Sequence, residues 1–217
     1  MSAASNANPD PAQRAATRPE SLDAVRKQMF IDFCDALESH YIPYVILAGH
    51  RDYPERIASD VDFMVSERDF ARLPAILNAP GCVRGAQIVQ ILEHEISARY
   101  FVLARQEGER IAYLHPDSAA SYRLDARLWL RSDSVLATRR RSAGGFWIPA
   151  AAVEFEYYLF KRAEKEGVEA RHLEQLRALL NEDLAGCRES LQRMFPPELV
   201  EPLVTAIVNT DVDWFHA

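Results

Sequence analysis

Two aspartates at alternate positions in an apolar run constrain this chain more than any other feature. Asp60 and Asp62 flank Val61, and the apolar run continues through Phe63 and Val65. Alternate residues of a strand point to the same face and lie roughly 6.5 Å apart along it. The pattern therefore predicts a strand with two carboxylates on one face and apolar side chains on the other. Two adjacent carboxylates repel each other unless a cation lies between them, and Mg²⁺ accepts oxygen ligands of this kind, usually together with substrate phosphates.

The residues before this pair form a second apolar run that ends in a turn. Residues 44–48 read Tyr-Val-Ile-Leu-Ala, and Gly49 interrupts the run. A polar loop containing Tyr53 and Pro54 then leads to the two acids. Since glycine takes up backbone angles that other residues avoid, the sequence predicts a strand, a turn at Gly49, a loop and the acid-bearing strand.

Hydrophobic periodicity and turn signals outline the rest of the chain. Three apolar runs at residues 87–92, 98–104 and 110–114 are predicted to be antiparallel neighbours, because their links are short. Helices are predicted at residues 21–40, 66–77, 149–162, 169–185, 190–195 and from 196 onward. The predicted fold class is α+β, with a small mixed sheet flanked by helices and followed by an all-helical C-terminal region.

The expected division of the chain follows from the same pattern. Residues 1–20 contain almost no large apolar side chain and are predicted to be a disordered tail. Residues 21–148 are predicted to form the α/β domain, and residues 149–217 the helical C-terminal region.

Composition narrows the classes of protein that need to be considered. The formal net charge of −7 argues against a general nucleic-acid binder, which normally has a basic face. No apolar run reaches the roughly 20 residues that span a bilayer, and the N-terminus lacks the features of a signal peptide. The scattered cysteines, Cys34, Cys82 and Cys187, are typical of buried thiols in a reducing compartment rather than of disulfides or a zinc site. A cytoplasmic protein without a membrane span is therefore expected.

A third carboxylate is expected if the aspartate pair serves two-metal phosphoryl or nucleotidyl transfer. Asp117 follows the run at 110–114 and is favoured for this role. Asp125 is the alternative, and the sequence leaves it open.

These motifs together resemble a known family. The features are the glycine-ended strand, Tyr53-Pro54, Ser-Asp-Val-Asp-Phe-Met-Val at 59–65, the later strand acid and Tyr-Arg-Leu-Asp-Ala-Arg-Leu at 122–128. The sequence over roughly residues 42–165 is similar to the nucleotidyltransferase superfold, the DNA polymerase β-like group. The similarity is greatest to a bacterial branch associated with surface-polysaccharide loci. The resemblance implies the nucleotidyltransferase fold and transfer of a nucleoside monophosphate from a nucleoside triphosphate to an acceptor hydroxyl or phosphate.

The resemblance also implies roles for particular residues. Asp60, Asp62 and Asp117 match the catalytic, metal-binding acids, which would hold two Mg²⁺ ions about 4 Å apart, with Mn²⁺ as a substitute. The predicted substrate-binding residues include Gly49, His50 and Ser59. Lys161 and Arg162 are predicted separately, from their place on the helix that begins near Pro149, to face a triphosphate across the cleft. One departure stands out, because the family usually has serine at the position of His50. This histidine either donates to a phosphate or blocks the pocket.

Other interpretations remain open at this stage. The Asp-x-Asp pair is also a glycosyltransferase motif, although only one helix and one strand precede it here. His50, His94 and His115 lie on separate segments without the close spacing of a metal site. A non-catalytic member of the fold that binds a nucleotide or a partner protein is the main alternative to an enzyme. The acceptor, a small molecule or a protein, is not specified by the sequence.

Overall fold

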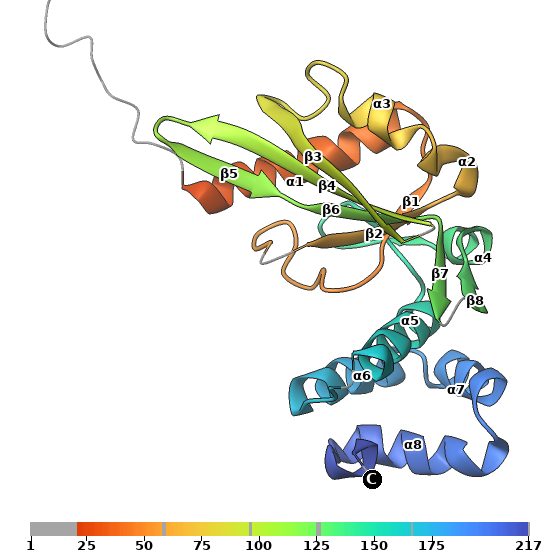
Figure 1. The fold of residues 1–217 in the computed structure, drawn as a ribbon. Helices are drawn as coiled ribbons and strands as arrows, with labels where there is room; N and C mark the ends of the chain where they lie inside the picture. The colour runs from red at the N-terminus through yellow and green to blue at the C-terminus, as the bar shows by residue number, and fades with distance from the viewer. Residues whose placement is uncertain (1–20, 58–59, 96, 125–126, 166, 217) are drawn as a thin grey trace, which may run out of the picture.

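The computed structural model describes residues 21–57, 60–95, 97–124, 127–165 and 167–216. The predicted disordered tail at 1–20 lies outside these residues. Figure 1 shows a sheet with helices on both sides and a helical region at the C-terminal end. The α+β class, the small mixed sheet and the helical C-terminal region are therefore confirmed.

The central sheet contains six strands within the described residues. Its hydrogen-bonded order is β1 (Tyr44–Ile46), β2 (Val61–Val65), β6 (Pro116–Ala119), β4 (Ala98–Glu107) and β3 (Ala86–Glu95). Strand β5 (Arg110–Leu114) pairs with the other end of β4. Only β2 and β6 run parallel; the other pairs are antiparallel. Strands β5 and β6 pair with successive parts of β4 without a shift in register. The chain therefore passes directly from the β4–β5 hairpin into β6, the strand beside β2.

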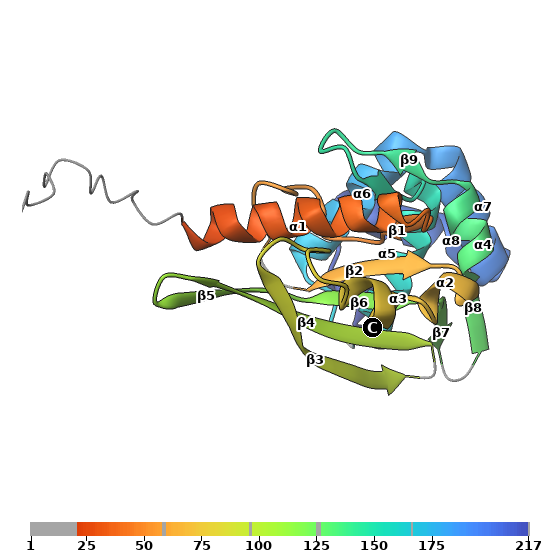
Figure 2. The ribbon, with the colours of Figure 1, turned by 90° about the horizontal axis from the view of Figure 1, so that it is seen from above.

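The first helix, α1 (Leu22–Ser39), covers one face of this sheet. Ser21 begins it as predicted, because its hydroxyl accepts a hydrogen bond from the Ala24 amide at 3.1 Å. Buried side chains of α1 such as Phe33 pack against the sheet, with Phe33 edge-to-face on Phe63 of β2. Figure 2 shows α1 running in roughly the same direction as the strands when the molecule is seen from above.

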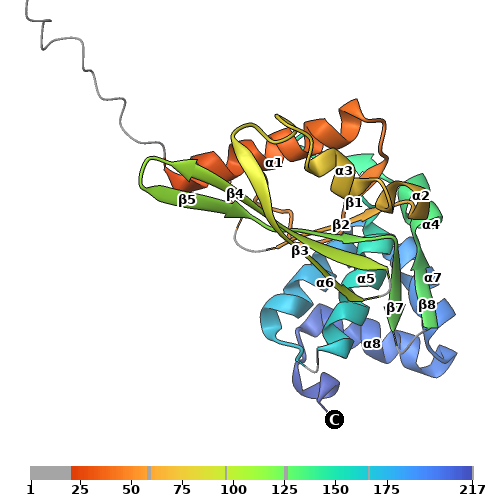
Figure 3. The ribbon, with the colours of Figure 1, turned by 45° about the horizontal axis from the view of Figure 1, so that its top comes forward.

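Alternation along β1 and β2 divides their apolar residues between two layers. Tyr44 and Phe63 point toward α1 and belong to its core. Val45 and Met64 point the other way and pack with Tyr157 of helix α5 (Ala151–Glu164). Asp62 lies between Val61 and Phe63 and has the parity of Met64, so it also faces the side of α5. Figure 3 shows α1 on one side of the sheet and the later helices on the other.

The C-terminal helices form a core of their own around buried leucines and valines. They are α5, α6 (Ala170–Glu182), α7 (Leu184–Met194) and α8 (Pro197–Asn209). The predicted helix boundary in this region is wrong, since one helix was expected to continue to residue 185 and the next to begin near 190. Asp183 ends α6 and caps α7, accepting a hydrogen bond from the Gly186 amide at 2.9 Å. A short polar side chain that caps the next helix outweighed the continuous helical pattern.

The helix predicted at 66–77 is also interrupted. It consists of α2 (Glu67–Phe70) and α3 (Leu73–Leu77). Pro74 has no amide hydrogen to continue the helical ladder, so the chain restarts with this proline in the first turn of α3. Ser66 nevertheless caps α2 as predicted, accepting from the Asp69 amide at 3.1 Å.

Two two-stranded ribbons connect the sheet to the helical region. The β7–β8 hairpin (Ser121–Leu124 and Arg127–Arg131) leads into α4 (Ser132–Ala137), which packs against β1 and β2. The β9–β10 ribbon (Arg140–Arg141 and Trp147–Ile148) leads into α5. The predicted division between residues 148 and 149 stays a prediction, because α5 packs both on the sheet and on the later helices.

No helix in the described part of the chain is long and apolar enough to cross a membrane. The cytoplasmic location stays a prediction.

Candidate active site

A cavity of about 620 Å³ lies between the α5 side of the sheet and the C-terminal half of α5. The sheet contributes acidic side chains to it, and α5 contributes basic and aromatic ones. The turn after β1 closes one end through Ala48 and Gly49. Opposite charges thus face each other across the cavity.

The three predicted acids, Asp60, Asp62 and Asp117, all line this cavity. Asp62 of β2 and Asp117 of β6 are direct partners in the parallel register, so their side chains project from adjacent strands to the same face. Asp60 precedes β2 and has the same parity as Asp62. The acids therefore come together as the sequence pattern requires, and their catalytic role stays a prediction.

The predicted basic residues on α5 also line the cavity. Lys161 Nζ lies 2.5 Å from Asp62 Oδ2 and donates a second hydrogen bond to the Tyr157 hydroxyl at 3.2 Å. The Lys161 and Asp62 side chains are 16% and 23% exposed, so this ion pair is partly shielded from water. The Arg162 guanidinium lies 5.1 Å from the centre of the Tyr158 ring. Both cations thus lie on the wall opposite the acids, and Lys161 reaches across to them.

Tyrosines surround this charged space. Burial raises the pKa of the Tyr157 phenol well above its ordinary value, and the nearby Asp62 charge adds to the effect. Burial, followed by the charges of Asp62 and Asp60, raises the pKa of Tyr53 to about 12. The phenols consequently stay neutral at physiological pH and act as hydrogen-bonding groups.

Asp60 is held from the sheet side by two further residues. The Tyr100 hydroxyl of β4 donates to Asp60 Oδ1 at 2.9 Å, and His115 Nδ1 lies 3.5 Å from the same oxygen. Partial burial, then the hydrogen bond and charge of Asp60, raises the pKa of Tyr100 to about 12. Asp60 is 49% exposed, so these contacts orient a carboxylate that remains open to solvent.

Gly49 and His50 face different cavities. Gly49 lies at the first one with a φ of +76°, a conformation that glycine adopts without strain. The His50 side chain turns away into a second cavity of about 280 Å³ and contacts Glu154 of α5. The structure therefore brings Gly49, Lys161 and Arg162 to the acids but does not bring the His50 ring there.

Three predicted features cannot be placed. Ser59 and the alternative acid Asp125 lie outside the described residues. So does Ala126 in the motif at 122–128. The predicted site residues whose positions the structure describes are thus the three acids, Gly49 and His50 of the turn, and Lys161 and Arg162 of α5.

Three residues that make polar contacts beside the two cavities were not predicted from the sequence. Tyr100 orients Asp60, Tyr122 donates to Glu164 of α5 at 2.7 Å, and Glu154 binds His50. Tyr122 begins the motif at 122–128 and could have been found there. Tyr100 could be identified only from its strand register, because it is the partner of Asp117 across β4 and β6.

The cavity contains carboxylate oxygens, the hard type of donor that Mg²⁺ binds. A metal ion at Asp62 Oδ2 would have to displace the Lys161 ammonium that lies against this oxygen. Within the described residues, no group of three His, Cys, Asp or Glu side chains is gathered closely enough to hold a metal ion. Asp60, Asp62 and Asp117 would therefore supply part of a ligand set that substrate phosphates and water complete, as is usual for Mg²⁺.

Comparison with known proteins adds no evidence on the family of this chain. No protein-family model matches the chain, and no curated protein matches it. JHP933 from Helicobacter pylori aligns with 92% of this chain over 94% of its own length, at 10% identity and a TM-score of 0.33. A protein named as a putative nucleotidyltransferase from H. pylori aligns with 91% over 96% of its own length, at the same identity and TM-score. Likeness at this level establishes neither the fold nor the function of the chain.

Proposed function

We propose that this protein is a Mg²⁺-dependent nucleotidyltransferase. The observation that carries the proposal is the cavity in which Asp60, Asp62 and Asp117 face Lys161 and Arg162. Acids that hold a divalent cation and basic residues that hold phosphates are the two groups that a nucleoside triphosphate requires. The likeness of the motifs at 59–65 and 122–128 to the nucleotidyltransferase superfold supports the same choice.

The reaction would transfer a nucleoside monophosphate to an acceptor. The acceptor oxygen attacks the α-phosphorus, and a new P–O bond forms as the bond to the β-phosphate oxygen breaks. Pyrophosphate leaves with the bonding electrons, and the acceptor loses its proton. Asp60, Asp62 and Asp117 would hold the Mg²⁺, which would supply charge neutralisation and Lewis acidity at the reacting phosphate.

Residues of this chain would divide the remaining tasks. Lys161 and Arg162 bind triphosphate oxygens and offset their charge. Asp117, on the strand beside Asp62, favours deprotonation of the acceptor. Tyr100 keeps the Asp60 carboxylate oriented through its hydrogen bond. The Gly49 turn leaves room for the triphosphate to approach the backbone.

The acceptor is proposed to be a hydroxyl or phosphate of a small molecule or protein. A place in surface-polysaccharide metabolism is proposed on the sequence resemblance alone.

The test begins with binding. The purified protein is titrated with ATP, GTP, CTP and UTP in the presence and absence of Mg²⁺ by calorimetry. Pyrophosphate release is then measured with panels of sugar phosphates, alcohols and proteins as acceptors. Mg²⁺-dependent binding and release that is lost in Asp62→Asn are expected. No triphosphate binding under any of these conditions would refute the assignment.

A non-catalytic nucleotide-binding or partner-binding protein is the second candidate. The observation that favours it is the short ion pair between Lys161 and Asp62, which neutralises an acid that a metal ion needs. Triphosphate binding that is unchanged by Mg²⁺, without pyrophosphate release, would support this candidate over the enzyme.

A further inference from the structure

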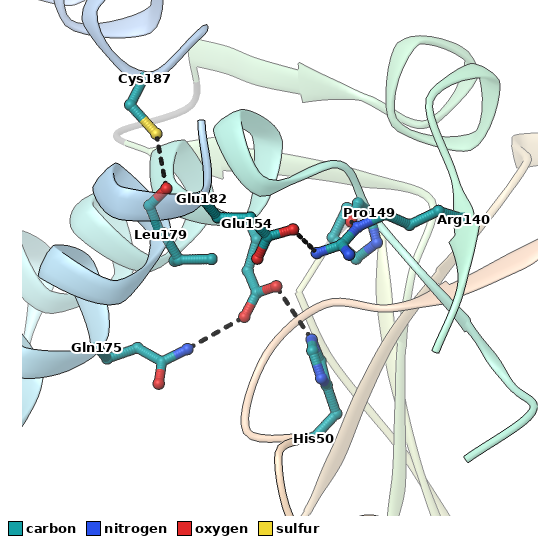
Figure 4. A network of polar contacts seen from close by, with 8 residues as sticks. All are labelled: His50, Arg140, Pro149, Glu154, Gln175, Leu179, Glu182 and Cys187. Carbon is teal, nitrogen blue, oxygen red and sulfur yellow. Dashed lines mark hydrogen bonds and ion pairs between the residues drawn. The ribbon is translucent and has the colours of Figure 1, made fainter. Parts of the chain in front are cut away.

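Glu154 is a carboxylate buried at the junction between the sheet and the helical region. Its side chain is 2% exposed, and that of His50 is 10% exposed. His50 Nε2 lies 3.1 Å from Glu154 Oε2, and Gln175 Nε2 of α6 donates to Oε1 at 3.2 Å. An ionised carboxylate can only accept hydrogen bonds, so His50 Nε2 would be the donor to Glu154 in its ionised form. Figure 4 shows Glu154 between His50 and Gln175, each contacting a different oxygen.

A buried carboxylate is costly unless its oxygens are hydrogen-bonded. Both Glu154 oxygens are bound, and each partner comes from a different element. His50 belongs to the turn that follows β1, and Gln175 belongs to α6. Glu154 thus joins the glycine turn, α5 and α6 at one point.

The position of Glu154 on α5 links this junction to the candidate active site. Glu154 and Lys161 are seven residues apart, which is close to two helical turns. They therefore lie on the same side of α5, roughly 10.5 Å apart along its axis. Glu154 binds the turn after β1, and Lys161 binds Asp62 of β2. Two polar contacts at the two ends of one helix face thus fix α5 against the sheet.

We infer that His50 and Glu154 are positioning residues that set the distance between the acids of the sheet and the cations of α5. The inference rests on the proposed function and assigns His50 a role other than the substrate contact predicted from the sequence. His50 stands where the resembling family has serine, and serine is too short to reach Glu154. Its imidazole therefore holds α5 in place through Glu154, while the Gly49 backbone remains the part of the turn that contacts the triphosphate.

The inference predicts a specific pattern of kinetic losses. His50→Ser and Glu154→Ala should each lower the rate of pyrophosphate release about 10- to 100-fold, since misplacement by about 1 Å costs that much. Affinity for the triphosphate, measured by calorimetry with the best of ATP, GTP, CTP and UTP, should change less than about threefold. Glu154→Gln keeps one oxygen that can accept from His50 and should restore most of the rate.

A double variant separates positioning from direct contact with substrate. If His50 acts through Glu154, the His50→Ser and Glu154→Ala double variant should be no slower than either single variant. A phosphate ligand would behave differently: His50→Ser would weaken triphosphate binding, Glu154→Ala would not, and their effects would multiply. That pattern would overturn the inference.

Folding measurements test whether the variants lose activity only because they lose their structure. Chemical denaturation of the two single variants and the double variant reports the coupling between His50 and Glu154 without any nucleotide. The free energies of unfolding of the variants are expected to show coupling between the two residues, and their far-UV circular dichroism should remain native-like. Additive effects on the free energy of unfolding would overturn the contact between His50 and Glu154. Absence of triphosphate binding in the wild type would overturn the proposed function and the positioning role with it. If the wild type binds the triphosphate but the rate losses of His50→Ser and Glu154→Ala are additive in the double variant, the positioning role alone would be overturned.

Discussion

The two cavities beside the Gly49 turn differ in how their charges are satisfied. In the larger cavity, acids of the sheet face basic residues of α5 across about 620 Å³, and Lys161 bridges to Asp62. In the smaller one, of about 280 Å³, the buried side chains of His50 and Glu154 pair directly, and the half-exposed Arg140 and Glu182 pair with each other at 2.6 Å. Charges arranged around an open space are typical of sites that bind ligands, whereas directly paired buried charges hold elements together. Residues of the larger cavity are therefore expected to control activity, and those of the smaller one stability and alignment.

The largest effect should come from the acid at the centre of the larger cavity. Asp62→Asn keeps the size of the side chain but removes its charge, so pyrophosphate release should fall about 1,000-fold. The same change at Asp35, exposed on α1, is the matched control and should leave the rate unaltered. Equal thermal unfolding of both variants would show that the loss is chemical. Retention of more than a tenth of the wild-type rate by Asp62→Asn would remove Asp62 from the catalytic set.

The smaller cavity should respond chiefly in stability. Glu154→Ala leaves His50 and Gln175 without their partner, which should lower the free energy of unfolding by about 2 kcal/mol in urea denaturation. Glu55 forms a surface pair with Lys27 and is 74% exposed, so Glu55→Ala should cost less than about 0.5 kcal/mol. Equal losses of unfolding free energy at the two positions would show that the buried pair does not stabilise the fold more than the exposed pair.

Lys161 tests the link between the acids and the opposite wall. Lys161→Ala removes one charge-assisted contact to the triphosphate and should weaken binding roughly tenfold, equivalent to about 1.4 kcal/mol. Calorimetry with the triphosphate and Mg²⁺ measures the change, and Lys27→Ala is the surface control. Tighter triphosphate binding by Lys161→Ala would instead mean that the ion pair with Asp62 blocks the site.

The smallest effect concerns the helical region and is a dependence on pH. Burial lowers the pKa of His172, and its Nδ1 accepts a hydrogen bond from the Glu169 amide at 3.1 Å. The folded protein thus binds this proton less readily than the unfolded chain, whose histidine titrates at about 6.5. Stability contributed by neutral His172 is present above this pH and is lost as the pH falls through the lowered pKa.

Urea denaturation between pH 5 and pH 7.5 measures this contribution. His172→Gln should unfold with a shallower dependence on pH than the wild type over the same interval. A slope identical to that of the wild type would show that His172 is not the titrating group.

The fold was largely predictable from the sequence because its main signals are local. The alternation around Asp60 and Asp62 and the cap at Ser21 each depend on neighbouring residues. Errors arose where one residue outweighed a longer pattern, as Pro74 did between α2 and α3 and Asp183 did between α6 and α7.

The candidate site was predictable only in part. The aspartate pair and the third acid followed from spacing and resemblance, and Lys161 and Arg162 from their place on a predicted helix. The orienting role of Tyr100 was not legible, because it depends on the register of β4 against β6. Nothing in the sequence distinguishes Glu154 from the other polar residues of its helix.

The sequence alone determined that two carboxylates share one face of a strand that follows a glycine turn, since side-chain alternation is a property of the strand itself. Only the tertiary structure decided which distant residues meet there. Lys161 reaches Asp62 across 99 residues of sequence, and His50 reaches Glu154 across 104. The physical reason is that helix docking follows from burial of apolar surface on the whole sheet, and polar pairs form only where that docking brings them together.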